Sequence, residues 1–239
     1  MIGSRKQHLV KGLMLTIGCL AATGGRAQDS TIVFGGADGR EKSYYGYLGL
    51  LHHVNPDIAG EGALVRVFGL YGEYDYKSTA VPRGDVDADM VAGDVMLGYQ
   101  WAVSKGVLRG FAGLDYEDHD LSPNNRYDSN LGSDLGVKFQ GEFETDYLSQ
   151  YYAGVIGSYG TAKERYWLRA RGGYNFGGYI VGPEGVLTGD QEYDEQRIGA
   201  FLMLVNPEWG LSVSTGYSDA NSRRGGGSMY GALELSTRF

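Results

Sequence analysis

Apolar and polar side chains alternate along most of this 239-residue chain. From Val91 to Trp101, apolar residues and glycine occupy every second position, and the positions between them hold Ala92, Asp94, Met96 and Gln100. Successive side chains of an extended strand point to opposite faces, so this period of two predicts strands with one apolar and one more polar face. Such strands suit a sheet that separates lipid from a polar interior.

The same pattern predicts twelve strands, an even number, with no linker or repeat that would mark a second domain. Their expected ranges are 31–38, 43–53, 62–76, 87–103, 106–118, 129–144, 147–161, 164–176, 179–188, 193–204, 209–219 and 228–239. We therefore predict an all-β fold, a closed antiparallel transmembrane β-barrel of about 12 strands. One barrel domain is expected to cover residues 28–239.

The last residues of the chain are typical of the closing strand of an outer-membrane barrel. Leu233, Leu235 and Phe239 fall on one expected face, Glu234 and Arg238 fall on the other, and the final residue is aromatic. We interpret Leu233, Leu235 and Phe239 as a barrel-end assembly signal. Outer-membrane lipid and the barrel-assembly machinery are the partners that this interpretation implies.

The lengths of the connections support the barrel independently. If the chain starts in the periplasm, the connections after strands 3, 5 and 11 face outward, and these are the long ones, at 77–86, 119–128 and 220–227. The connections after strands 4, 6, 8 and 10 face the periplasm and are short. Long outer and short inner connections are expected of bacterial barrels, although the connection at 54–61 is longer than this rule predicts.

The start of the chain predicts a secretory signal peptide at residues 1–27. A basic stretch from Arg5 to Lys11 precedes an apolar run from Leu13 to Ala22, and small residues allow cleavage after Ala27. No later stretch approaches the roughly 18 to 20 apolar residues of a membrane helix. We expect the protein in the outer membrane of a Gram-negative bacterium.

Composition narrows the possible chemistry. Tyrosine, with 19 residues, outnumbers phenylalanine, with 8, as the aromatic girdles of a membrane barrel would require. The single cysteine, Cys19, lies in the predicted signal peptide, so the mature chain has no disulfide and no cysteine-ligated metal. Without the four basic residues of that peptide, the mature chain has 17 basic and 29 acidic residues. This negative net charge argues against a nucleic-acid partner.

Charges of both signs are expected on the inner face of the barrel. Glu184 joins them if Pro183, which has no N–H to donate, interrupts or bulges its strand and so aims the carboxylate at Arg169, Arg171 or Arg197. Mixed charge favours an interior that is cross-linked by ion pairs over a pore for a charged solute. The complete candidate cluster is Arg66, Asp94, Arg109, Asp115, Asp134, Glu142, Arg169, Arg171, Glu184, Glu195 and Arg197.

The histidines offer an enzymatic alternative. His119 or His53 with a neighbouring serine would suit a lipid-modifying hydrolase or acyltransferase, but the chain has no Gly-x-Ser-x-Gly motif. His52 and His53 are adjacent and should face opposite sides of a strand, which argues against a shared metal ion. We expect no catalytic residue, no cofactor and no metal.

Several short motifs, in order along the chain, resemble the cellulose biosynthesis protein BcsS family. Among them are residues 97–101 (LGYQW), 113–116 (GLDY), 156–159 (IGSY), 182–185 (GPEG) and 196–199 (QRIG). The resemblance implies a non-catalytic outer-membrane accessory protein of bacterial cellulose biosynthesis or export, and hence of exopolysaccharide and biofilm formation. Its role would be binding, anchoring or narrow passage, with cellulose or other cellulose-synthesis proteins as partners. The alternatives are the lipid-modifying enzyme above and a small pore or adhesin.

Overall fold

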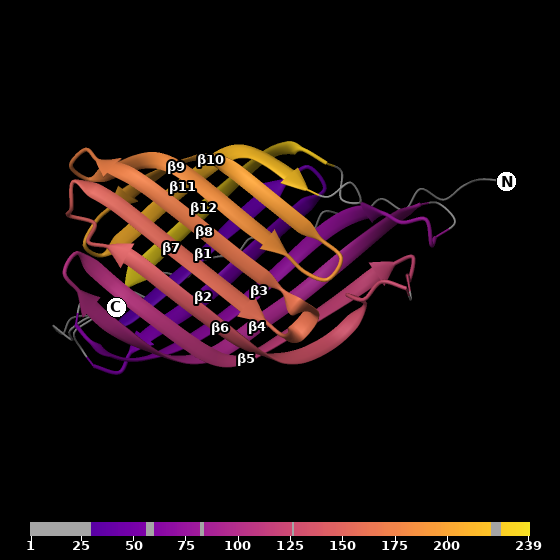
Figure 1. The fold of residues 1–239 in the computed structure, drawn as a ribbon, viewed down its shortest axis with the longest axis horizontal. Helices are drawn as coiled ribbons and strands as arrows, with labels where there is room; N and C mark the ends of the chain where they lie inside the picture. The colour runs from indigo at the N-terminus through magenta and orange to yellow at the C-terminus, as the bar shows by residue number, and fades with distance from the viewer. Residues whose placement is uncertain (1–29, 56–59, 82–83, 126, 221–225) are drawn as a thin grey trace.

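The computed structural model describes residues 30–55, 60–81, 84–125, 127–220 and 226–239, and these form a closed antiparallel barrel of twelve strands (Figure 1). The fold prediction is confirmed. The strands are β1 Thr31–Arg40, β2 Ser43–His53, β3 Gly62–Lys77, β4 Asp85–Val103, β5 Gly106–Ser122, β6 Gly132–Thr145, β7 Tyr151–Gly160, β8 Tyr166–Asn175, β9 Tyr179–Gly189, β10 Asp194–Val205, β11 Trp209–Ala220 and β12 Ser228–Arg238.

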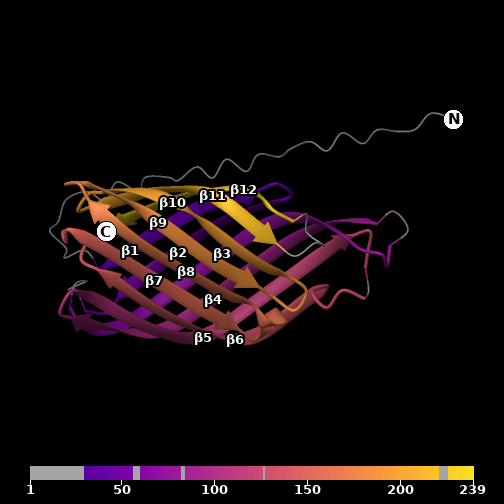
Figure 2. The same ribbon diagram turned by 45° about the horizontal axis from the view of Figure 1, so that its top comes forward.

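Each strand pairs with its sequence neighbours, and the ladder between β1 and β12 closes the sheet. At this seam the Phe239 N–H donates to the Thr31 carbonyl at 2.8 Å, and the Phe239 carbonyl accepts from the Thr31 N–H at 3.0 Å. The strands cross the barrel obliquely, as the two views show (Figures 1 and 2). Closure leaves no exposed strand edge, because every backbone ladder continues around the wall.

The connections define two ends of the barrel. We call the end that carries Phe239 and the connections after β2, β4, β6, β8 and β10 the turn end, and the opposite end the loop end; the turn end lies at the left of Figure 1. The turn-end connections 104–105, 176–178 and 206–208 are short, and the connection after β2 is the long exception that the sequence shows. The loop end carries the longer connections after β3, β5 and β11.

Three expected strand ranges extend too far. Residues 129–131 and 147–150 lie in turns, because the Asp128 carboxylate accepts from the Asn130 N–H and the Asp146 carboxylate accepts from the Leu148 N–H, both at 2.9 Å. Residues 161–165 contain the short 3-10 helix η1, Ala162–Glu164, instead of strand. Side-chain bonds to nearby backbone compete with the sheet ladder at these positions.

The two faces of the wall follow the predicted alternation. Outward side chains include Leu97, Leu135 and Ile198, which are 68%, 69% and 72% exposed. In β12, Leu233 lies on the outer face and Tyr230 is buried on the inner one, while Phe239 is exposed just beyond the strand. An apolar exterior of this kind requires a lipid environment.

The wall is much taller on one side than on the other. β3, β4 and β5 have 16, 19 and 17 residues, whereas β7 and β8 have 10 each. The inner face of the tall side carries an apolar cluster at the loop end, to which Leu70, Ala92 and Leu131 are packed. The cluster consists of Tyr74, Tyr76, Val81, Val86, Ala88, Met90 and Leu121.

Hydrogen bonds tie the loop-end connections to each other. The Asn130 amide donates to Asp190 at 2.9 Å, and the Ser129 hydroxyl donates to Glu192 at 3.0 Å. These bonds link the β5–β6 connection to the β9–β10 connection, which β7 and β8 separate along the wall. These two loop-end connections are therefore held together across the width of β7 and β8.

Among the described residues, none of the helical structure is long and apolar enough to span a bilayer. The predicted signal peptide, residues 1–27, lies outside the described residues.

Candidate functional site: a charge-lined cavity

The barrel encloses a cavity of about 1330 Å³. It extends from the turn-end connections, including Lys105 and Asn206, to buried loop-end residues, including Asp190 and Tyr193. The Asp190 side chain is only 2% exposed. The lining of the cavity therefore includes the turn-end connections at one end and a buried side chain of the loop end at the other.

The structure places ten of the eleven residues of the candidate cluster on the lining of this cavity. Asp134 is the exception. It lies in the part of β6 nearest the loop end, it is exposed, and its carboxylate accepts from the Leu135 N–H at 3.0 Å. Alternation predicted correctly which face of β6 carries Asp134. The residue does not line the cavity because β6 extends beyond the cavity towards the loop end.

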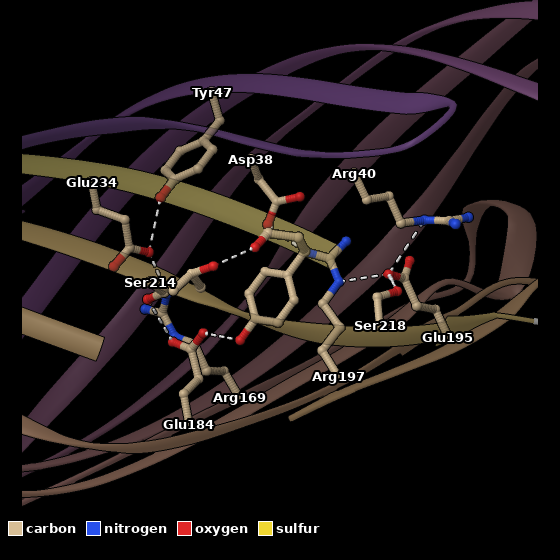
Figure 3. Close-up of polar contacts among 12 residues, drawn as sticks. Asp38, Arg40, Tyr47, Arg169, Glu184, Glu195, Arg197, Ser214, Ser218 and Glu234 are labelled. Carbon is tan, nitrogen blue, oxygen red and sulfur yellow. Dashed lines mark hydrogen bonds and ion pairs between the residues drawn. The ribbon is translucent and has the colours of Figure 1, made fainter. Parts of the chain in front are cut away.

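One ion-pair network joins β10 to β1 across the interior (Figure 3). Arg197 donates to Glu195 at 2.7 Å and also to Asp38, while Arg40 lies 3.4 Å from Glu195. Ser218 donates a further hydrogen bond to Glu195. All these side chains except Asp38 are almost fully buried, so their charges compensate one another in a region of low dielectric.

A second network is centred on Glu184 of β9. The Glu184 carboxylate pairs with Arg171 of β8 and accepts from the Ser214 hydroxyl at 3.2 Å and the Tyr230 hydroxyl at 3.0 Å. Arg171 in turn donates to Ser214 at 2.9 Å. Side chains of β8, β9, β11 and β12 thus converge on one carboxylate.

Glu234 of β12 extends this network across the lumen. It accepts from Arg171 at 2.8 Å, from Arg169, and from the Tyr47 hydroxyl at 3.0 Å (Figure 3). β8 and β12 are not neighbours in the wall, so these bonds cross the interior of the barrel. We call such a link between non-adjacent strands a chord. These bonds fix the shape of this half of the barrel.

Of the two effects predicted for Pro183, the structure shows an interrupted ladder and no bulge. β9 is continuous, and Arg171 opposite Glu184 keeps the same register as Tyr174 opposite Val181. Only the pairs at Gly172 and Gly173 are missing from this ladder, where Pro183 has no N–H to donate. Glu184 faces inward through ordinary alternation.

A third group lies on the tall side of the barrel. Asp94 of β4 binds Arg66 through one oxygen and Lys138 through the other, the latter at 2.7 Å. The Arg66 guanidinium also stacks over the rings of Phe34 and Phe68, at 5.8 and 4.7 Å from their centroids. Such cation–π contacts hold the arginine against the wall.

A fourth group lies towards the turn end. Arg109 pairs with Glu142 at 3.1 Å and lies 3.8 Å from Glu144, which accepts a hydrogen bond from the Tyr147 hydroxyl. Burial, together with the neighbouring Glu144 carboxylate, raises the pKa of Tyr147 well above its ordinary value. The phenol therefore stays protonated and acts as a donor.

In the described part of the chain, neither candidate histidine ring, that of His119 or that of His53, has a hydrogen bond to a serine hydroxyl. His119 is buried between the Tyr74 hydroxyl at 2.8 Å and the Glu117 carboxylate at 2.6 Å. The other ring, that of His53, contacts the Gln100 amide at 3.4 Å. His119 instead joins a structural chain, because Glu117 also binds Arg165 at 2.7 Å.

Sequence reasoning missed several charged residues of the cavity. Asp38 and Arg40 lie on the inner face of β1, and their spacing of two was a usable signal. Lys138 and Glu144 continue the inward alternation of β6. Arg165 lies in the connection between η1 and β8, but within the expected strand 164–176 it has the same parity as Arg169 and Arg171, so alternation offered a signal for it as well.

The lining is nearly balanced in charge, with nine basic and eleven acidic side chains. Most of these groups form ion pairs with one another. The rest of the cavity lining includes neutral polar side chains and aromatic rings. Among the described residues, no cluster of histidine, cysteine or acidic side chains could hold a metal ion. The arrangement suits a neutral, polar ligand better than a charged one.

Comparisons with known proteins agree with this description. A family model described as cellulose biosynthesis protein BcsS matches residues 32–239. No curated protein matches the chain.

Among solved structures, an outer-membrane channel from Pseudomonas putida F1 is 14% identical and aligns with a TM-score of 0.56, over 91% of this chain and 100% of the channel. The β domain of the Bordetella autotransporter BrkA is 11% identical, with a TM-score of 0.50 over 88% of this chain and 99% of that domain. At these identities the similarity shows the barrel fold alone.

Proposed function

Because the chain belongs to the cellulose biosynthesis protein BcsS family, we propose that it is a non-catalytic outer-membrane protein whose cavity accommodates a neutral glucan chain during cellulose production. The family match supports the connection to cellulose. The apolar exterior and the barrel fold support the outer membrane of a Gram-negative bacterium as its location. With that topology, the turn end and the part of the cavity lining that reaches it face the periplasm.

The single observation that carries the proposal is the cavity with its balanced lining. A sugar polymer has no net charge, exposes hydroxyl groups at its edges and apolar surfaces on its ring faces. Fixed polar groups can bind the hydroxyls, and rings such as Phe68 and Trp167, which line the space, can contact the faces. A turn-end opening would admit a chain from the periplasmic side.

Filling the cavity tests the proposal. Ser158 of β7 lines the cavity, whereas Val155 of the same strand points outward and is 42% exposed. In a strain that lacks the gene, wild-type protein and Val155→Trp should restore cellulose, measured by dye binding and by glucose release after digestion. Ser158→Trp should not restore it, although the folded barrel is present at equal amounts.

Full restoration of cellulose by Ser158→Trp would refute a role for the cavity. A deletion strain with unchanged cellulose would refute the proposed function as a whole. Combined substitution of His52, His53 and His119 should leave cellulose per folded barrel unchanged, because none of these rings has a catalytic role in the proposal.

A further inference from the structure

In the described part of the chain, Asp115 is an acidic residue of the cavity whose carboxylate accepts no hydrogen bond from another residue. Its Oδ1 atom is buried and has no hydrogen-bond partner in the described part of the chain, and the residue is 9% exposed. Each of the other ten acidic residues of the lining has a basic side chain, a polar side chain or a backbone N–H as its partner. These residues are Asp38, Asp94, Glu117, Glu142, Glu144, Asp146, Glu184, Asp190, Glu195 and Glu234.

The surroundings of Asp115 hold its carboxylate in one place. A methyl group added at Gly160 would overlap Oδ2, and one added at Gly136 would lie 2.9 Å from Oδ1. The absence of side chains at these two glycines lets the carboxylate lie against the wall. The nearest cation of this region, Lys138, is already bound to Asp94 at 2.7 Å. An unpaired buried carboxylate is costly, and a ligand that donates a hydrogen bond would relieve that cost.

Two aromatic rings line the cavity on the far side of Asp94 from Asp115, and the Arg66 guanidinium lies over both. The rings of Phe34 and Phe68 stack with centroids 6.4 Å apart, and Gly49 between them leaves the space that their overlap needs. Phe68 is two strands from Asp115, which corresponds to about 10 Å along the wall. The hydrogen-bond register aligns one inward residue from each of six consecutive strands: Phe34, Gly49, Phe68, Asp94, Asp115 and Gly136.

We propose that Asp115 anchors a sugar subsite, in which its carboxylate accepts a hydrogen bond from a glucan hydroxyl, and Phe34 and Phe68, two or more strands away, supply aromatic lining to the same side of the cavity. The inference rests on the proposed function and specifies the binding residue. A neutral hydroxyl fits better than a metal cation, because the described residues provide no cluster of metal ligands and the neighbouring Asp94 is already neutralised.

Binding of cellohexaose to the purified, detergent-solubilised full barrel tests the subsite by titration calorimetry. Asp115→Asn keeps the shape of the side chain but removes its charge, and should weaken binding by about tenfold or more, since hydrogen bonds to charged groups are the stronger ones. Asp134→Asn is the matched control, because Asp134 lies outside the cavity, and its affinity should equal that of wild type. Equal affinity of wild type and Asp115→Asn would overturn the subsite and leave the proposed function intact.

Two further measurements complete the test. Gly160→Ala keeps the carboxylate but displaces it, and should weaken binding even if Asp115→Asn fails to fold. No binding of cellohexaose to wild type would overturn both the subsite and glucan binding in the cavity. Calcium chloride alone provides the competing probe, and saturable calcium binding that requires Asp115, with no effect of Asp115→Asn on cellohexaose, would identify a cation site instead.

Discussion

The Glu184 network provides a quantitative test of how the barrel is held together. The Glu184 and Arg171 side chains are 2% and 5% exposed, so solvent does not screen their ion pair. In Glu184→Gln, Arg171 keeps Glu234 at 2.8 Å and Ser214 at 2.9 Å as partners. The loss should therefore be about that of one charged hydrogen bond, on the order of 2 kcal/mol.

Glu184→Leu should be more damaging, at about 3–5 kcal/mol, because it removes one partner from a buried pair and also leaves the Tyr230 hydroxyl without its acceptor. Adding Arg171→Met to this variant should recover part of the loss, since an apolar pair carries no uncompensated charge. The exposed Glu41→Gln in the β1–β2 turn is the control and should change stability by less than about 0.5 kcal/mol.

The assay is urea unfolding of the barrel in phospholipid vesicles, followed by tryptophan fluorescence, with the heat-induced mobility shift on gels as a second readout. The double-mutant cycle with Arg171→Met isolates the pair energy. If Glu184→Gln unfolds at the same urea concentration as wild type and the cycle shows no coupling, the buried Glu184–Arg171 pair does not stabilise the barrel.

Other predictions concern the outside of the barrel, its seam and its lumen. Phe239→Ala should lower the fraction of newly made protein that migrates as a compact barrel, whereas Phe176→Ala, also an exposed turn-end aromatic, should not; equal yields would contradict an assembly signal. Leu233→Arg places a charge in lipid and should cost about 2–4 kcal/mol near the bilayer centre, and an unchanged urea midpoint would show that this face is not in lipid. In planar bilayers, Glu234→Ala should raise the conductance above a low wild-type level by opening the chord from β8 to β12; identical conductance would mean that this chord does not restrict passage. His119→Phe should destabilise the barrel by about 1–3 kcal/mol, because Tyr74 and Glu117 each lose a buried hydrogen bond, without lowering cellulose per folded barrel.

The strands and their faces could be predicted because each depends on local information. Alternation with a period of two predicts directly which side chains face the interior. The strands of the barrel keep this alternation from β1 to β12. The ends of strands were less predictable, because Asp128 and Asp146 form local turns that hydropathy does not register.

The pairing of the charges could not be predicted in the same way. Asp38 and Arg197 are 159 residues apart, and Arg169 and Glu234 are 65 apart, and each pair meets across the interior. Which chord forms depends on the register around the whole wall, which no local pattern contains. Alternation likewise gives no height within the barrel, so it could not separate Asp134 from the cavity or show that the buried Oδ1 atom of Asp115 has no hydrogen-bond partner among the described residues.

The barrel closes only when the seam between β1 and β12 forms, so closure depends on this one ladder. The ladder joins Ile32 to Arg238, a contact of very high sequence separation, and such contacts form slowly because a long loop must close first. Until they form, the first and last strands both present unpaired N–H and C=O groups that can recruit other chains. The kinetic risk of aggregation is therefore concentrated at this one junction, where a helper that shields both strands would have its greatest effect.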